Sequence, residues 1–220
     1  MKKILLIEDV PSRQEDFMSE MDFSLLDYDN ILENAIGDKY TDIEASLKND
    51  DINFSEYMMI ITHENAFGVD KKYSLEKLKE YCEETETPLV LFSGGATNYY
   101  NNSKNEYMEL NTKDFYSPNL KVFLDAYREG SYNILMLAYG EKWILNTLLN
   151  VLEKTNNFLD KNSEDYIVYN EYENFTKIDM LDGLNHSFYD LPIEDGWVYR
   201  KDLIVLKDSI LEYIQEVSNV

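Results

Sequence analysis

The feature that most constrains the fold is an uninterrupted apolar run, Ile4 to Ile7, which two lysines precede and Glu8-Asp9 follows. A short apolar run between turn signals is typical of a strand that is buried on both faces, as in a parallel sheet. In open α/β sheets, ligands bind outside the carboxyl ends of the strands. We therefore expect Glu8 and Asp9 at the functional edge of a sheet.

Four further segments have the composition of strands. Residues 57–61 and 89–92 are strong apolar candidates, and residues 30–36 and 107–110 are shorter ones. Helical patterns lie between these segments. Five strands that alternate with helices predict an α/β fold with a doubly wound five-stranded parallel sheet.

The helices are less sharply defined than the strands. In the first of them, Phe17, Met21 and Leu25 recur at a spacing of four, which predicts one face of an amphipathic helix. Ser74 is expected to cap a later helix. The segment 96–105 is rich in Asn and Tyr, and we expect it to be mostly loop.

The chain is expected to divide into two domains. Residues 1–130 form the α/β domain, and residues 131–220 form a mainly α-helical extension that is acidic and aromatic. Residues 134–158 favour one long helix over a sixth strand, because Met, Leu and Ala outnumber β-branched residues at its start. A helix capped by Asp202 closes the chain.

The formal net charge of the 220 residues is −23, and the charge is spread along the chain. Such a protein repels nucleic acid and anionic membranes, so neither is expected as a direct partner. A basic protein or a larger multi-subunit complex suits the charge. No apolar run reaches the ~20 residues of a membrane span. The single cysteine, Cys82, excludes an intramolecular disulfide and indicates a cytoplasmic protein.

Polar side chains follow several of the predicted strands and are expected to converge at one edge of the sheet. They are Glu8, Asp9, Thr62, His63, Glu64, Ser93 and Lys113. Two adjacent acids suit Mg²⁺, so Glu8 and Asp9 are candidate metal ligands, although solvated acids are the simpler interpretation. A hydroxyl at Ser93 and an ammonium at Lys113 suit phosphoryl oxygens. Alternatively, Lys113 forms an ion pair with one of the two acids.

The order of these motifs resembles the receiver domain of two-component response regulators, which has a flavodoxin-like fold. The segment 4–10 resembles the first strand and acidic pair of that family, and 89–93 resembles its fourth strand with the switch hydroxyl. The segment 112–115 resembles its fifth-strand lysine with a following aromatic residue, except that Asp114 stands where the family often has proline. The resemblance covers residues 1 to about 130.

The resemblance fails at the third strand, where the family has its phospho-accepting aspartate. That position is Thr62, or His63 after a slip of one residue. In the family the acceptor is a carboxylate, which forms an acyl phosphate and completes the metal site. The resemblance therefore implies a degenerate pseudo-receiver that acts by binding other proteins.

Our first hypothesis is a non-catalytic regulatory or scaffold protein in signalling, with no cofactor beyond the candidate Mg²⁺. The aromatic extension is the expected partner surface, because aromatic residues are enriched at interfaces. Its candidate residues are Trp143, Tyr189, Trp197 and Tyr199.

Two rival hypotheses stay open. A metal-dependent or nucleotide-processing α/β enzyme would use Glu8 and Asp9, with His63 and Glu64 as an acid/base pair. An acidic decoy would occupy the nucleic-acid channel of a basic partner, and its binding would weaken with added salt.

Overall fold

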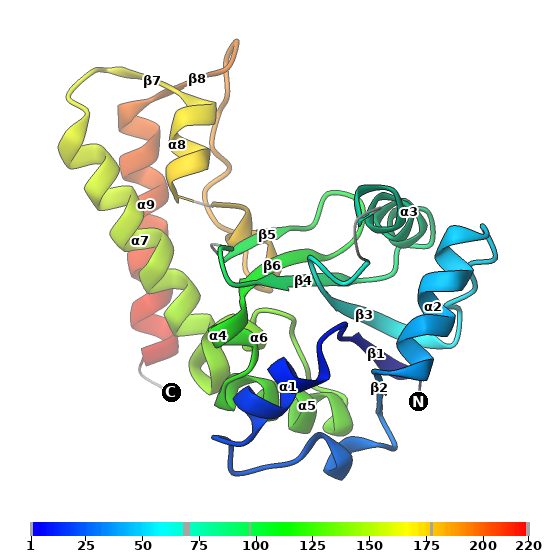
Figure 1. Cartoon of the computed structure of the whole chain (residues 1–220). Helices are drawn as coiled ribbons and strands as arrows, with labels where there is room; N and C mark the ends of the chain where they lie inside the picture. Colours follow the sequence, from blue (N-terminus) through cyan, green and yellow to red (C-terminus); the bar gives the residue numbers. More distant parts are fainter. Residues whose placement is uncertain (1, 68–70, 97, 177, 219–220) are drawn as a thin grey trace. The chain divides into compact units, whose positions relative to one another are not determined.

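The computed structural model describes residues 2–67, 71–96, 98–176 and 178–218. The chain divides into two compact units, residues 1–140 and 141–220 (Figure 1). Residues 131–140, which the sequence pattern placed in the extension, lie in the first unit.

The first unit contains one sheet and the helices that surround it. Its strands are β1 (Lys3–Ile7), β2 (Leu32–Ala35), β3 (Tyr57–His63), β4 (Leu89–Ser93), β5 (Tyr99–Asn101) and β6 (Tyr107–Asn111). Its helices are α1 (Pro11–Met18), η1 (Leu25–Tyr28), α2 (Asp38–Lys48), α3 (Lys71–Glu84), α4 (Thr112–Phe115), α5 (Pro118–Glu129) and α6 (Met136–Tyr139). A short turn of helix, η2 (Gly140–Lys142), leads into the second unit.

The strand order in the sheet is β2-β1-β3-β4-β6-β5. The first five strands in this order are parallel, and β5 is antiparallel to β6 at the edge. The predicted α/β fold with a mainly parallel sheet is confirmed. The described residues of 96–105 are mostly loop, as expected; the exception is β5, where Tyr100 pairs with Met108 and is fully buried. Aromatic residues favour strands, and this preference outweighed the surrounding asparagines.

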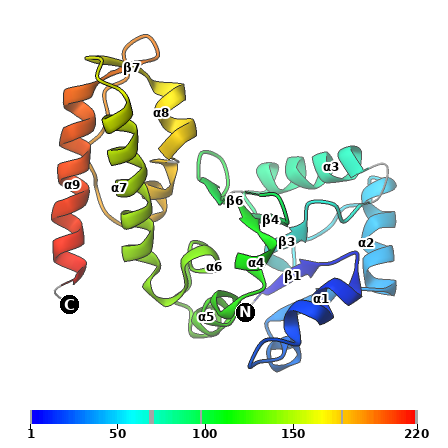
Figure 2. The same ribbon diagram turned by 60° about the vertical axis from the view of Figure 1, so that its left-hand side comes forward.

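The apolar runs are strands because both of their faces are covered. In one row of the sheet, Leu5 is in register with Ile60, and Ile60 with Leu89. This row packs on Leu47 of α2 and on Leu78 of α3. Figures 1 and 2 show α1 and α5 on the opposite side of the sheet from α3. Helices therefore cover both faces, as a buried parallel sheet requires.

The helix boundaries differ from the sequence prediction at three places. The first helix ends at Met18, so Met21 lies beyond it and Leu25 begins η1. Ser74 is buried inside α3, which begins at Lys71, and it is not a cap. The last helix begins two residues before Asp202, at Arg200. Side-chain spacing defines a helical face, but it does not define where the helix begins or ends.

The long helix expected from residue 134 is interrupted at Gly140. This glycine has φ of +66°, and a Cβ at this position would lie 2.5 Å from Oδ1 of Asn119. The side chain of Asn119 in α5 donates a hydrogen bond to the carbonyl of Ala138 at 3.1 Å. The chain therefore leaves α6 at a backbone conformation that favours glycine, and a new helix starts at Trp143.

The second unit is mainly helical, and it contains one small sheet. Its elements are α7 (Trp143–Lys161), β7 (Tyr166–Val168), α8 (Tyr169–Thr176), η3 (Ile178–Gly183), β8 (Trp197–Tyr199) and α9 (Arg200–Ser218). Helices α7 and α9 lie side by side (Figures 1 and 2). Their core includes Phe158, Tyr172 and Leu203. The predicted C-terminal helix is confirmed.

A two-residue turn positions β8. Asp195 and Gly196 both have positive φ, of 53° and 81°. Glu194 and Trp197, on either side, exchange two backbone hydrogen bonds of 2.9 Å. Two positive φ values at the centre of a tight hairpin define a type I′ turn, for which Asp-Gly is a preferred sequence.

None of the helices in the described ranges combines the length and the apolarity that a membrane span requires.

We expect Gly196→Ala to lower the unfolding free energy of the second unit by about 1 kcal/mol, because a side chain disfavours positive φ. Gly95→Ala is the matched control. Gly95 lacks a positive φ, and a Cβ there would meet nothing within 4 Å. Urea denaturation followed by tryptophan fluorescence measures both variants. Equal effects of the two substitutions would contradict the assignment of the turn.

Candidate functional site

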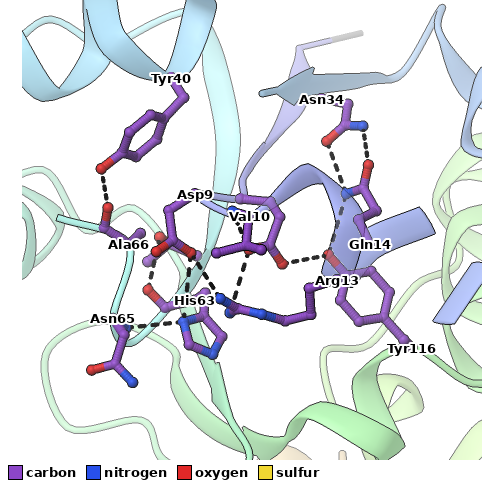
Figure 3. Close-up of polar contacts among 12 residues, drawn as sticks. Asp9, Val10, Arg13, Gln14, Asn34, Tyr40, His63, Asn65, Ala66 and Tyr116 are labelled. Carbon is purple, nitrogen blue, oxygen red and sulfur yellow. Dashed lines mark hydrogen bonds and ion pairs between the residues drawn. The ribbon is translucent and has the colours of Figure 1, made fainter. Parts of the chain in front are cut away.

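The carboxyl ends of β1 and β3 bring together three of the residues that the sequence singled out. Glu8 and Asp9 directly follow β1, and His63 is the last residue of β3. Nδ1 of His63 lies 3.9 Å from Oδ1 of Asp9 (Figure 3). Parallel strands end at the same edge, so the topology of the sheet places these side chains together.

Glu8 is fully buried, and both of its carboxylate oxygens accept hydrogen bonds. Oε1 accepts from the N–H of Val10 at 3.1 Å, and Oε2 accepts from the hydroxyl of Tyr116 at 3.1 Å. Burial raises the pKa of Glu8 to about 7, because desolvation disfavours the charged form. The hydrogen bonds from Val10 and Tyr116 and the charge of Arg13 act in the opposite direction.

Arg13 of α1 contacts both acids through one guanidinium group, and Figure 3 shows its contact with Asp9. Nη2 donates a hydrogen bond to Oδ1 of Asp9 at 3.2 Å, and Nη1 lies 3.4 Å from Oε1 of Glu8. Nη1 is buried without hydrogen-bond geometry, so its contact with Glu8 is an ion pair only. Arg13 was not among the site residues predicted from the sequence. Its spacing of four from Asp9, at the start of a helix, was the available signal.

Two hydrogen bonds fix the end of β3 and the turn that follows it. The N–H of Asn65 donates to Nδ1 of His63 at 3.1 Å, so this nitrogen is an acceptor and the neutral ring carries its proton on Nε2. The distance of 3.9 Å to Asp9 is too long for a hydrogen bond. Tyr40 of α2 donates to the carbonyl of Ala66 and holds the following turn (Figure 3).

Thr62 points away from His63, because side chains alternate between the faces of a strand. Thr62 is fully buried in register with Ile7 and Leu91, and its hydroxyl donates to the carbonyl of His63 at 3.4 Å. Glu64 is exposed in the turn after β3. The position of the expected phospho-acceptor therefore offers a buried hydroxyl or an imidazole and no carboxylate.

A second set of side-chain hydrogen bonds extends from Glu8 to Tyr116, Gln14 and Asn34. Nε2 of Gln14 donates to the hydroxyl of Tyr116 and to Oδ1 of Asn34, both at 3.2 Å (Figure 3). Asn34 in turn donates to Oε1 of Gln14 at 2.6 Å. Tyr116 and Glu8 are 108 residues apart in sequence, and no local pattern marks either Gln14 or Tyr116 as a partner of Glu8.

Aromatic rings pack on the ring of Tyr116, which is buried. The ring of Tyr116 stacks on Phe17 of α1 at 5.5 Å and meets Phe92 of β4 edge-on at 5.4 Å. Phe92 also stacks on Phe115 at 4.3 Å and contacts His63 at 5.2 Å. These contacts fix the ring that donates to Glu8.

The other two predicted site residues lie elsewhere. Ser93 follows Phe92 and therefore points to the opposite face, where it lines a cavity of about 460 Å³ with Glu64 and Lys79. Lys113 is exposed in α4. Among the described residues it forms no ion pair with Glu8 or Asp9, and Arg13 pairs with both acids instead. The predicted pairing of Lys113 was wrong.

The donor set at this edge does not fit a magnesium site. Mg²⁺ requires near-octahedral oxygen ligands and keeps several waters. The oxygens of Glu8 already face Val10, Tyr116 and Arg13, and Arg13 also binds Asp9. In the part of the chain that the structure describes, no three His, Cys, Asp or Glu side chains are grouped to hold a metal. The guanidinium supplies the positive charge that the two acids require.

The candidate partner residues are distributed over the second unit. Trp197 and Tyr199 lie together on β8, but Tyr189 binds α9 through a 3.0 Å hydrogen bond to Asp202. Trp143 begins α7 and β7 follows the end of that helix, so the two tryptophans lie at opposite ends of a 19-residue helix. Tyr166 joins Tyr199 across the small sheet, with ring centroids 4.5 Å apart.

The raised pKa of Glu8 predicts a specific pH dependence of stability. The pKa is about 7 in the folded chain and 4.5 in the reference state, so the contribution of Glu8 is fully present below pH 4.5. It is lost as the pH rises to about 7, because only the unfolded chain releases the proton in that interval. We expect the unfolding free energy of Glu8→Gln not to show this decrease, which amounts to about 3 kcal/mol at most in wild type.

Thermal or urea unfolding of both proteins across this pH interval measures the difference. Glu20→Gln, on the surface just after α1, is the control for loss of a glutamate. Parallel pH profiles of wild type and Glu8→Gln would contradict the prediction.

No protein-family model, curated protein or solved structure matches this chain. The comparisons therefore assign it to no known family.

Proposed function

We propose that this chain is a non-catalytic regulatory or scaffold protein whose first unit is a receiver-like module. In this proposal the module does not take up a phosphoryl group and acts through protein–protein contacts in a larger complex. The observation that carries the proposal is the position of Arg13, which contacts Glu8 and Asp9 at 3.4 and 3.2 Å.

The strand order supports a receiver-like arrangement. The five parallel strands follow one another as β2-β1-β3-β4-β6, and numbered among themselves they have the order 2-1-3-4-5 of flavodoxin-like sheets. Helices α1, α2 and α3 connect the first four of them in chain order. The connection from β4 to β6 departs from this pattern, because it contains the antiparallel strand β5.

The contacts of Glu8 favour a structural role over an enzymatic one. A general acid or base has to reach the proton that it transfers. Glu8 is fully buried, and its oxygens are engaged by the N–H of Val10 and the hydroxyl of Tyr116. Its raised pKa therefore reflects burial inside a polar network of the fold.

The first experiment tests the role of Arg13. We expect wild type to take up no phosphoryl group from acetyl phosphate and Mg²⁺, as measured by intact mass, and to keep its melting temperature when Mg²⁺ is added. Arg13→Gln removes a charged hydrogen bond and should lower the unfolding free energy by about 2 kcal/mol. Mg²⁺ should recover part of that loss in this variant alone, because the two acids lose their neutralising partner.

Arg128→Gln is the matched control. Arg128 contacts the ring of Tyr28 and the carboxylate of Asp125, so its loss also removes a guanidinium but leaves Glu8 and Asp9 paired. Phosphorylation of wild type, or its stabilisation by Mg²⁺, would contradict the proposal and favour an active metal site.

The second experiment tests the role in a complex. We expect mild-salt affinity purification from the native host, followed by size-exclusion chromatography with mass determination, to yield a stoichiometric protein complex. A chain that emerges alone would contradict the scaffold role, whatever the result for Arg13.

A further inference from the structure

The small sheet of the second unit has one buried face and one exposed aromatic face. Ile167 of β7 is in register with Val198 of β8, and both side chains are buried in the core of the unit. Tyr166, directly opposite Tyr199, is 51% exposed, and Trp197 is 46% exposed. Since side chains alternate along a strand, these three residues share the outer face, which we call the β7–β8 aromatic face.

Backbone hydrogen bonds and the side chain of Arg200 hold the strand β8 of this face in place. The type I′ turn at Asp195–Gly196 sets the position of Trp197, and the N–H of Tyr169 donates to the carbonyl of Gly196 at 2.9 Å. The guanidinium of Arg200, the residue after Tyr199, donates to the carbonyl of Leu159 at 2.9 Å. Large aromatic side chains on a fixed scaffold and open to solvent are typical of a binding surface.

Acidic residues flank the face at both of its strands. Glu164 and Asp165 directly precede Tyr166, and Glu194 and Asp195 precede Trp197 across the turn; all four are exposed. A lysine of the protein itself makes a cation–π contact with this face, because Nζ of Lys201 lies 4.7 Å from the centroid of the Tyr199 ring. The face therefore combines π surfaces with carboxylates around them.

We infer that the β7–β8 aromatic face binds a basic, arginine-bearing segment of a protein partner. A guanidinium both stacks on aromatic rings and forms bidentate contacts with carboxylates, and this face offers both groups. The inference rests on the proposed function, because it names the surface and the partner chemistry through which the scaffold acts.

Charge disfavours the other occupants of such a face. A second copy of the chain would bring the same four acids toward each other, and each copy carries a formal net charge of −23. Nucleic acid is repelled for the same reason. A basic protein segment is attracted by the acids that exclude these alternatives.

The test uses the full chain and two fluorescein-labelled peptides of equal length and charge, in which glycine alternates with arginine or with lysine. Fluorescence anisotropy measures binding at low and moderate salt. We expect the arginine peptide to bind more tightly than the lysine peptide, and its affinity to fall as the salt concentration rises. Trp197→Ala should lower the affinity for the arginine peptide by about fivefold, which corresponds to the loss of one exposed cation–π contact.

Variants separate the rings from the charges. Glu194→Gln with Asp195→Asn should weaken both peptides and reduce the salt dependence. Leu26→Ala is the control for loss of an exposed apolar side chain, since Leu26 is 82% exposed in η1 of the first unit. Circular dichroism and the melting temperature check that each variant folds.

Three results would overturn the inference. They are equal affinity for the two peptides, binding of the arginine peptide that Trp197→Ala leaves unchanged, and a dimer of the chain that Trp197→Ala converts to a monomer. None of these results bears on phosphoryl uptake or on isolation of a stoichiometric complex, so the proposed function fails or stands separately.

Discussion

The carboxylate of Glu8 at the end of β1 is the group on which the organisation of the first unit depends. Removing a carboxylate from water is costly unless it is paired and hydrogen-bonded. The partners that offset part of this cost come from two segments, with Val10 and Arg13 near the start of the chain and Tyr116 after α4. The acid therefore ties β1, α1 and the segment before α5 into one polar network within an aromatic shell.

Much of the first unit's fold could be predicted because its signals are local. The apolar run 4–7 and the segments 57–61 and 89–92 became strands, since a buried parallel strand needs apolar residues on both faces. Within the segment 96–105, which was expected to be mostly loop, β5 was missed, because three residues among asparagines carry a weak strand signal; Tyr100 is buried there and pairs with Met108 of β6, the next strand in the chain. The turn at Asp195–Gly196 was missed although its dipeptide is a recognised hairpin signal.

The site was predictable only as far as sheet topology determines it. Glu8, Asp9 and His63 lie together because they follow or end neighbouring parallel strands, but Ser93 lies on the other face because side chains alternate along β4. The cation that pairs with the acids is Arg13, because a guanidinium one helical turn away reaches both carboxylates. Gln14 and Tyr116 belong to the hydrogen-bond network of Glu8 through contacts between residues far apart in the chain, and residue spacing in a single sequence does not reveal such contacts.

The shared guanidinium also constrains how such a site can change in evolution. A metal site built from these acids would require the loss of Arg13 and the gain of a carboxylate at the end of β3. The first change alone leaves two adjacent acids without their cation. The second alone adds a third acid beside Asp9, where His63 now lies. Each single change therefore leaves more unpaired negative charge at this edge, so a path to a metal site requires both changes together.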